Sequence, residues 1–240
     1  MSGMAALRAG AGLVTVATSA EALAGVAAHC PELMTEPLPA GYSGLELLSH
    51  RKTVLAIGPG LGTSSDVAAI VQETYRKHPR PVVMDADAIT ALAGFAEQPA
   101  ATRVLTPHPG EMATLTGKTI ASVQSDRVAA ARTAAMERQV ILVLKGQRTL
   151  IALPDGRVWI NPTGTPAMGT AGSGDILTGL ISGLIAQFPQ QTELAVAAAV
   201  WLHGRAGEFG AAALGEKHLI ATDLLHYLPE ATRELTNLSC

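Results

Sequence analysis

Short apolar runs that alternate with longer alanine-rich runs constrain the fold of this chain more than any other feature. A strand with one face in water alternates apolar and polar side chains, whereas a strand covered on both faces is apolar throughout. The second pattern predicts buried parallel strands at residues 13–19, 54–60, 81–87, 103–108 and 140–146. Between them, residues 64–78 and 125–139 carry helix signals: Ser/Asp capping chemistry in the first and an apolar stripe in the second. These patterns together indicate an α/β fold.

The character of the chain changes after residue 146. The segment TLIALPDGRVWIN (149–161) has two apolar runs around a Pro-Asp-Gly turn, which predicts an antiparallel hairpin. Two long helices are expected at 173–187 and 191–213. Because no repeat or linker divides the sequence, we expect one domain over residues 1–240. Its predicted architecture is a three-layer α/β/α sandwich, with a mostly parallel sheet and an antiparallel portion near the C-terminal half.

The composition fits such a domain and argues against several other classes of protein. Of 240 residues, 48% are hydrophobic, which is ample material for a core. Only 15% are charged and the net charge is −3, so we expect no nucleic-acid partner. The longest apolar runs, such as 194–202, fall short of the ~18 residues that a membrane span needs. No membrane partner is therefore expected.

The two ends of the chain carry no clear targeting or metal signal. Residues 1–20 faintly resemble a signal peptide, but Arg8 interrupts the apolar part, and a strand is the preferred interpretation. Cys30 and Cys240 match no zinc or disulfide pattern, and the seven histidines show no metal-ligand spacing. We therefore expect a reduced, cytoplasmic setting.

The segment GTPAMGTAGSGDILTG (164–179) combines five glycines with one acid where a helix is expected to begin. The N–H groups of Gly172, Ser173 and Gly174 precede that helix, and free amides at a helix N-terminus bind anions. Asp175 beside a bound phosphate makes sense as a base that takes a proton from an attacking hydroxyl. The alternative is simply a capped helix with an aspartate in its first turn.

Four predicted strands end in polar or glycine-rich residues. The ends are GPGLG (58–62), DAD (85–87), TPHPGE (106–111) and KGQRT (145–149). Because ligands of such sheets bind at the carboxyl ends of the strands, these four ends predict one site. No GxxxxGK[ST] loop occurs, and Thr63 stands where a dinucleotide fingerprint needs its third glycine, so nucleotide binding would use another architecture.

Each charged residue at these strand ends has a functional and a structural interpretation. Lys145 meets a phosphate or ends a solvated strand. His108 bonds a ligand phosphate or ribose and Glu111 orders metal-bound water, or both simply start a helix. Asp85 and Asp87 hold the waters of Mg²⁺ or cap the following helix, and capping or support of other ligands is preferred.

In these motifs the chain resembles the NAD(P)H-hydrate dehydratase family of the ribokinase-like small-molecule kinases. That family typically shows AALRAGAGLVTVAT, GPGLG, DADAL, TPHPGE, VLKG followed by Thr, and GTAGSGDVLTG, in that order. The corresponding stretches here are AALRAGAGLVTVAT (5–18), GPGLG (58–62), DADAI (85–89), TPHPGE (106–111), VLKGQRT (143–149) and GTAGSGDILTG (169–179). The resemblance covers nearly the whole chain and implies a ribokinase-like fold.

The resemblance also implies a repair reaction, classed as a lyase, that depends on ADP in bacteria and on ATP in eukaryotic members. The hydroxyl of the (6S)-hydrate of NADH or NADPH is phosphorylated and phosphate is then eliminated, which restores the dihydronicotinamide and leaves AMP and phosphate. Mg²⁺ is the implied cofactor and ADP the phosphoryl donor. An NAD(P)H-hydrate epimerase is the implied functional companion.

Residue by residue, the resemblance assigns roles on this chain. Gly62, His108 and Asp175 match positions that contact the hydrated nucleotide, and Asp175 is the implied base for its C6 hydroxyl. The anion hole matches Gly172, Ser173 and Gly174. No direct metal ligand is implied, with Glu111 and Asp87 acting through water. The nucleotide site matches Lys145, Gly146, Gln147, Arg148, Thr149 and Gly174.

One departure and two alternatives remain. Family members usually begin with a strand and a glycine-rich loop, whereas this sequence starts inside the following helix, so we expect a domain that lacks them. We also expect no epimerase domain, which some family members carry fused at the N-terminus. One alternative is an ATP-dependent kinase of a small alcohol, such as hydroxymethylpyrimidine or hydroxyethylthiazole, although such kinases usually have Asn where His108 stands. The other is an inactive nucleotide-binding homologue. We expect a homo-oligomer, taken here as a homotetramer.

Overall fold

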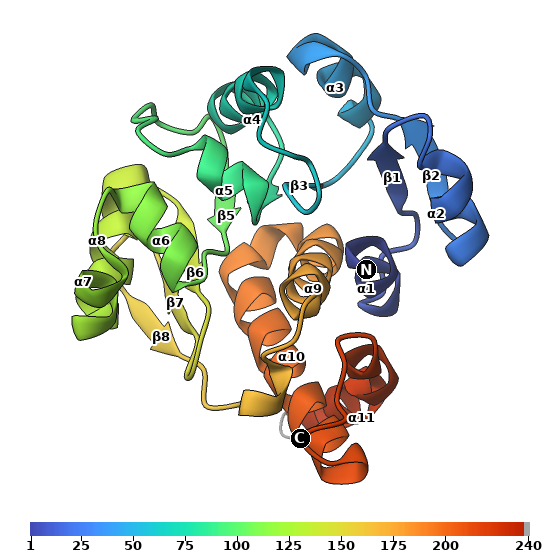
Figure 1. Cartoon of the computed structure of the whole chain (residues 1–240), viewed down its shortest axis with the longest axis vertical. Coiled ribbons are helices and arrows are strands. Elements are labelled where there is room, and N and C mark those ends of the chain that lie inside the picture. The colour runs from blue at the N-terminus through green and yellow to red at the C-terminus, as the bar shows by residue number, and fades with distance from the viewer. Residues whose placement is uncertain (238–240) are drawn as a thin grey trace.

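The fold is that of a computed structural model, in which residues 1–237 are described (Figure 1). The strands are β1 (Thr15–Thr18), β2 (Met34–Pro37), β3 (Leu55–Ile57), β4 (Val82–Met84), β5 (Arg103–Leu105), β6 (Ile141–Leu144), β7 (Leu150–Ala152) and β8 (Val158–Ile160). The helices before the last strand pair are α1 (Ser2–Arg8), α2 (Leu23–His29), α3 (Gly41–Ser49), α4 (Ser65–Lys77), α5 (Asp87–Ala91), α6 (Pro109–Thr116), α7 (Ile120–Ser125) and α8 (Arg127–Arg138). Those after it are η1 (Pro166–Met168), α9 (Ser173–Gln187), η2 (Pro189–Gln191), α10 (Thr192–Leu214) and α11 (Asp223–Asn237).

The main sheet has six strands in the order β3-β4-β5-β6-β7-β8. The first four run parallel, and β7 runs antiparallel to both β6 and β8. This topology confirms the predicted mostly parallel sheet and the hairpin over 149–161. Because β3 to β6 are neighbours and run parallel, their carboxyl ends form one continuous edge.

The main sheet is covered on both faces, which confirms the three-layer architecture. Val83, Val104 and Val143 belong to a core cluster shared with helices α9, α10 and α11. Met84, Leu105 and Leu142 belong to the opposite cluster, shared with α4, α5, α6 and α8. Successive strand residues therefore point into different layers, as the alternation of a strand requires. Continuous apolar runs are the sequence signature of this double burial.

Helices α1 and α9 pack closely because α9 presents glycines at positions 179 and 183. A Cβ at Gly179 would overlap the carbonyl oxygen of Ser2, and one at Gly183 would lie 2.7 Å from the carbonyl oxygen of Ala6. The four-residue spacing puts both glycines on one helix face. This contact holds the N-terminus of the described chain against the helix that carries Asp175.

Strand β1 is the one part of the predicted parallel sheet that does not join it. It forms within the predicted range 13–19 but pairs with β2, which was not predicted, in a separate two-stranded sheet. All four β1 residues are only partly buried, and α2 beside the pair buries none of its residues. The prediction of burial on both faces is wrong here because, within residues 1–237, no second helix layer covers this strand. Figure 1 shows β1 and β2 apart from the six-stranded sheet.

Within residues 1–237, no helix combines the length and the hydropathy that are needed to cross a bilayer. Cys30 is buried as a free thiol, whereas Cys240 lies outside the described residues.

Candidate active site

The loops that follow the parallel strands are joined to one another by backbone hydrogen bonds. The N–H of Asp85 donates to the carbonyl of Ile57 at 3.1 Å. That of Thr106 donates to Met84 at 3.1 Å, and that of Lys145 donates to Pro107 at 2.8 Å. The four predicted strand ends therefore meet at one edge of the sheet.

A buried ion pair lies at the centre of this edge. Lys145 Nζ donates to Asp85 Oδ1 at 2.7 Å and lies 3.5 Å from Glu111 Oε2. The Asp85 side chain is 2% exposed and the Lys145 side chain 19%. Thr178 Oγ1 donates to the other Asp85 oxygen at 2.8 Å. A charge this deeply buried is stable only when it is paired and hydrogen-bonded, as it is here.

Asp175 lies in the first turn of α9, next to this ion pair. Burial raises the pKa of its carboxyl, and the negative charge of Asp85 raises it further, while the N-terminal ammonium and Lys145 act in the opposite direction. No side chain caps α9, whose N-cap is Gly172, so Asp175 is not a capping residue. A half-buried carboxylate with a raised pKa beside a cation suits a general base.

Backbone amides at the start of α9 form the second part of the site. Gly172 has a φ of +90°, a left-handed conformation that favours glycine, and its carbonyl accepts from the N–H of Ile176. The N–H of Ser173 donates to Thr170 at 3.3 Å. The amides of Gly174 and Asp175 have no acceptor in the described part of the chain. Such open donors at a helix N-terminus attract anions.

His203, from α10, holds the first turn of α9 in place. Its Nε2 lies 2.9 Å from the carbonyl oxygen of Ser173 and 3.3 Å from the Ser173 hydroxyl. Burial lowers the pKa of His203 to about 4, although the bond to Ser173 acts in the opposite direction. The imidazole is therefore neutral at pH 7, and its Nε2–H donates to the carbonyl.

The TPHPGE segment forms a capping box at the start of α6. His108 is the N-cap, and its Nδ1 accepts from the amides of Gly110 at 2.9 Å and Glu111 at 3.2 Å. Glu111 Oε2 accepts from the His108 amide at 2.7 Å. The helix-start interpretation of both residues is thus confirmed. His108 remains half-exposed, and Glu111 joins it to Lys145.

Gly62 and Asp87 bind each other rather than the central ion pair. The N–H of Gly62 donates to Asp87 Oδ2 at 2.8 Å. The N-cap of α5 is Ala86, and no side chain caps that helix. Of the two preferred interpretations of Asp85 and Asp87, capping is therefore wrong, whereas support of other ligands stays a prediction. Asp85 instead turns inward to Lys145, and Asp87 braces the GPGLG loop.

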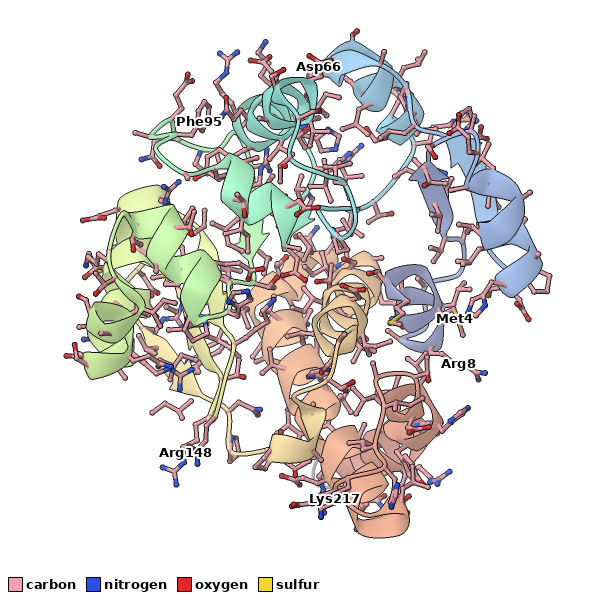
Figure 2. All side chains as sticks on the ribbon, in the orientation of Figure 1. Met4, Arg8, Asp66, Phe95, Arg148 and Lys217 are labelled. Carbon is pink, nitrogen blue, oxygen red and sulfur yellow. The ribbon has the colours of Figure 1, made fainter. Side chains whose placement is uncertain are left out.

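The KGQRT loop after β6 is braced by a residue that the sequence analysis did not single out. Arg127, at the start of α8, donates to the carbonyls of Leu144, Lys145 and Gln147. Gly146 has a φ of +132°, and the Thr149 hydroxyl donates to its carbonyl at 3.1 Å. Arg148 is exposed and extends away from the molecule (Figure 2). Of the residues in this loop, only Lys145 contacts the buried carboxylates of Asp85 and Glu111.

Thr178 was also missed, although its spacing gave a signal. It lies three residues after Asp175 in a helix, which puts the two side chains on the same face. A hydroxyl on the face of a proposed catalytic carboxylate is therefore a candidate partner for nearby groups. What the spacing does not give is the acceptor, Asp85, which lies 93 residues away in the chain.

A cavity of about 1160 Å³ opens beside Asp175. Its lining is mostly apolar and includes Val16 of β1, Ile57 of β3, Gly60 of the GPGLG loop and Gly179 of α9. This volume is large enough for a nucleotide-sized ligand. Asp175 thus has the ion pair and helix terminus on one side and a roomy apolar cavity on the other.

The acidic groups at this edge do not form a direct metal cage. Among residues 1–237, no three His, Cys, Asp or Glu side chains are placed to hold one ion. Asp85, Asp87 and Glu111 are each hydrogen-bonded to protein groups. Mg²⁺ commonly keeps several waters and binds through substrate phosphates with one or two carboxylates. The residues present therefore fit an ion held by a nucleotide and reached through water.

Comparison with known proteins gives a consistent family. The model of the family described as NAD(P)H-hydrate dehydratase matches residues 1–230. The bifunctional NAD(P)H-hydrate repair enzyme Nnr of Moorella thermoacetica is 45% identical over 243 residues, which cover 96% of this chain and 46% of that protein. The Escherichia coli enzyme of the same name is 38% identical over 239 residues, 97% of this chain and 45% of that protein. The chain thus spans about half the length of these curated relatives.

Solved structures agree with this assignment. The ADP/ATP-dependent NAD(P)H-hydrate dehydratase from Bacillus subtilis, co-crystallised with ATP and Mg²⁺, is 32% identical with a TM-score of 0.85. The match covers 97% of this chain and 83% of that one. A ribokinase-like superfamily protein from Enterococcus faecalis is 29% identical with a TM-score of 0.82, over 97% and 81% of the two chains. With the fold, the ordered motifs and the family match in agreement, this chain belongs to the NAD(P)H-hydrate dehydratase family and has its ribokinase-like fold.

Proposed function

We propose that this chain dehydrates the (6S)-hydrates of NADH and NADPH with ADP as phosphoryl donor. The observation that carries the proposal is the position of Asp175, between an open helix N-terminus, a buried lysine and a nucleotide-sized cavity. Family membership supports the same reaction. The relatives that share most of this chain are bifunctional enzymes about twice its length, so the activity of this chain by itself needs a direct test.

In the proposed reaction, Asp175 takes the proton of the C6 hydroxyl as that oxygen attacks the terminal phosphorus of ADP. The new O–P bond forms as the bond from phosphorus to the bridging oxygen breaks, and AMP leaves. The C6–O bond then breaks to release phosphate, and loss of a C5 proton restores the double bond. Little covalent chemistry falls to the protein, which supplies position and charge.

The amides of Gly174 and Asp175 and the ammonium of Lys145 are suited to the charge on the phosphoryl group. Mg²⁺, when bound to the nucleotide, supplies further positive charge to the phosphates. Glu111 and Asp87 would reach it through water. Gly62 and His108 border the same edge and are proposed to contact the hydrated nucleotide. Residues Gly146 to Thr149 are proposed to line the nucleotide site.

The setting of the reaction completes the proposal. A cytoplasmic location follows from the substrate, because reduced nicotinamide nucleotides are made and used there. A homo-oligomer, with a homotetramer as the expected form, is supported by exposed apolar side chains such as Leu13 and Leu47. An epimerase that interconverts the hydrate epimers would feed the (6S) form to this chain.

The direct test replaces Asp175 by Asn and follows recovery of reduced-nicotinamide absorbance from hydrated NADH with ADP and Mg²⁺. We expect turnover to fall about 10³-fold, because a general base is removed, while ADP binding measured by calorimetry survives. Asp155→Asn is the matched control, since Asp155 is exposed and pairs with Arg157 far from the site.

The same assay separates the alternatives. Accumulation of a phosphorylated alcohol from hydroxymethylpyrimidine or hydroxyethylthiazole with ATP, without hydrate turnover, would favour the small-alcohol kinase. Nucleotide binding without any turnover would favour the inactive homologue. Recovery of absorbance without ADP or ATP would refute the phosphorylation mechanism, and equal turnover by the Asn variant would remove Asp175 from the base role.

A further inference from the structure

Asp85 is the most deeply buried acid in the candidate site, and the proposed reaction gives it no role. Its side chain is 2% exposed, and its two oxygens accept from two separate elements. One carboxylate oxygen accepts a hydrogen bond from the ammonium of Lys145, after β6, and the other accepts from the hydroxyl of Thr178, on α9. Replacing a buried ion pair with apolar groups is often neutral or stabilising, so such a pair is weak evidence for stability alone.

The backbone around Asp85 is shaped to aim that side chain inward. A Cβ at Gly58 would overlap the carbonyl oxygen of Asp85, so only glycine lets the GPGLG loop close over it. Ala86, the next residue, has a φ of +50°, which is uncommon for a residue with a Cβ. Backbone strain of this kind collects at functional sites. Here it turns Asp85 towards Lys145 and Asp87 towards Gly62.

The ammonium of Lys145 lies directly against the first turn of α9. A Cβ at Gly174 would be 3.3 Å from Lys145 Nζ and 3.7 Å from Asp85 Oδ2. A cation at the positive end of a helix dipole is unfavourable by itself. The carboxylate of Asp85 offsets that repulsion and leaves both the lysine and the open amides in place for an anionic ligand.

We propose that Asp85 is a positioning residue, which locks Lys145 against the N-terminus of α9 and fixes through Thr178 the helix turn that carries Asp175. The inference rests on the proposed function for its effect on turnover. Its effect on the Lys145 side chain can be measured by nucleotide binding alone.

Electrostatics support the same role. The charged groups that face Asp175 are Asp85 after β4, Lys145 after β6 and the ammonium of Met1, just before α1, with Glu111 of α6 behind Lys145. After burial, the charge of Asp85 is the next cause that raises the pKa of Asp175. Removing that charge should therefore move the acidic limb of the rate profile to lower pH.

The first experiment compares Asp85→Asn with wild type in the hydrated-NADH assay between pH 4 and pH 8. We expect kcat to fall about 100-fold, as for other losses of positioning, and the acidic limb to move to lower pH. Thr178→Val should lower kcat about tenfold, and Thr178→Ser should restore it to within about twofold, because it keeps the hydroxyl. Asp155→Asn again serves as control.

The second experiment is a double-mutant cycle on ADP affinity, measured by calorimetry with Asp85→Asn, Lys145→Met and the double variant. Lys145→Met should weaken ADP binding by a certain factor in each background. We expect that factor to be about tenfold larger in the wild-type background than in the Asp85→Asn background. This cycle needs no turnover, so it decides the positioning role even where the proposed function fails.

Three results would overturn the inference. The first is a kcat of Asp85→Asn within about twofold of wild type, with the acidic limb of its rate profile at the same pH. The second is equal turnover by Thr178→Val and Thr178→Ser. The third is a double-mutant cycle in which the effects of Asp85→Asn and Lys145→Met on ADP affinity are additive. Should Asp85→Asn fail to fold, the Thr178 pair decides. Absence of hydrate turnover by the wild-type chain, with coupling intact in the cycle, would refute the proposed function and leave the positioning role standing.

Discussion

Strand β1 comes from an apolar run like those of the six-stranded sheet, yet the β1–β2 pair is buried very differently from that sheet. Every residue of β4, β5, β6 and β7 is buried, whereas β1 is partly buried throughout and β2 is largely exposed. Helix layers cover both faces of the main sheet, and the large cavity lies beside β1. The difference teaches that an apolar run predicts a strand, while its burial depends on what other segments pack against it.

The largest expected effect is a difference in local stability between the two sheets. Amides of β1 and β2 should exchange with deuterium about a thousandfold faster than those of β5 and β6, a gap of about 4 kcal/mol. The reason is that opening the small sheet exposes little buried apolar surface. Native-state exchange followed by mass spectrometry measures it, and equal protection in the two sheets would contradict the comparison.

A second prediction concerns the buried cation at the opposite edge of the main sheet. Arg103 is fully buried and donates to six backbone carbonyls, those of Thr74, Tyr75, His78, Arg80, Ala101 and Thr102. Arg103→Met should cost about 3 kcal/mol of unfolding free energy, because buried acceptors lose their donors.

The matched control for that change is a lysine that contacts the small sheet. Lys52 donates to Thr15 of β1 at 2.8 Å from a partly exposed position, so Lys52→Met should cost less than about 1 kcal/mol. Urea unfolding of both variants gives the two values. Similar costs would mean that the two sheets contribute alike to the stability of the fold.

The smallest expected effect is a pH dependence of the free energy of unfolding that comes from His203, on a helix that covers the main sheet. The folded pKa of His203 is about 4 against an ordinary value of 6.5, so its contribution is complete above pH 6.5 and is lost as the pH falls towards 4. We expect a loss on the order of 2 kcal/mol between pH 7 and pH 5, measured by urea unfolding. His203→Gln, which keeps an N–H donor, should show a smaller loss. An identical pH dependence in both proteins would remove His203 as its cause.

Much of the fold could be predicted because it depends on patterns within short segments. The predicted ranges for α9 and α10 differ from those in the structure by at most one residue, because caps, glycines and apolar spacing are local signals. The hairpin after β6 followed from its turn residues in the same way. By contrast, β2 was missed, since its sequence, MTEP, lacks the continuous apolar run that predicts a buried strand.

The sequence predicted which segments form the candidate site, but not which side chains bind one another there. Strand-end residues were expected to meet, and the hydrogen bonds between their loops join them. Arg127 was missed because its role depends on carbonyls that lie 17 to 20 residues further along the chain. The partners of Asp85 could not be predicted for a similar reason, since they come from the loop after β6 and from α9.

The sequence by itself determined the strands of the main sheet, several of the long helices, which strand ends carry chemistry, and where the glycine-rich turn before α9 falls. These follow from side-chain size, backbone freedom and hydrogen bonding over a few residues. Only the tertiary structure decided that Asp85, Lys145 and Thr178 share one buried cluster and that β1 stands apart from the main sheet. Burial and charge pairing depend on distances between remote segments, and local propensity does not encode those distances.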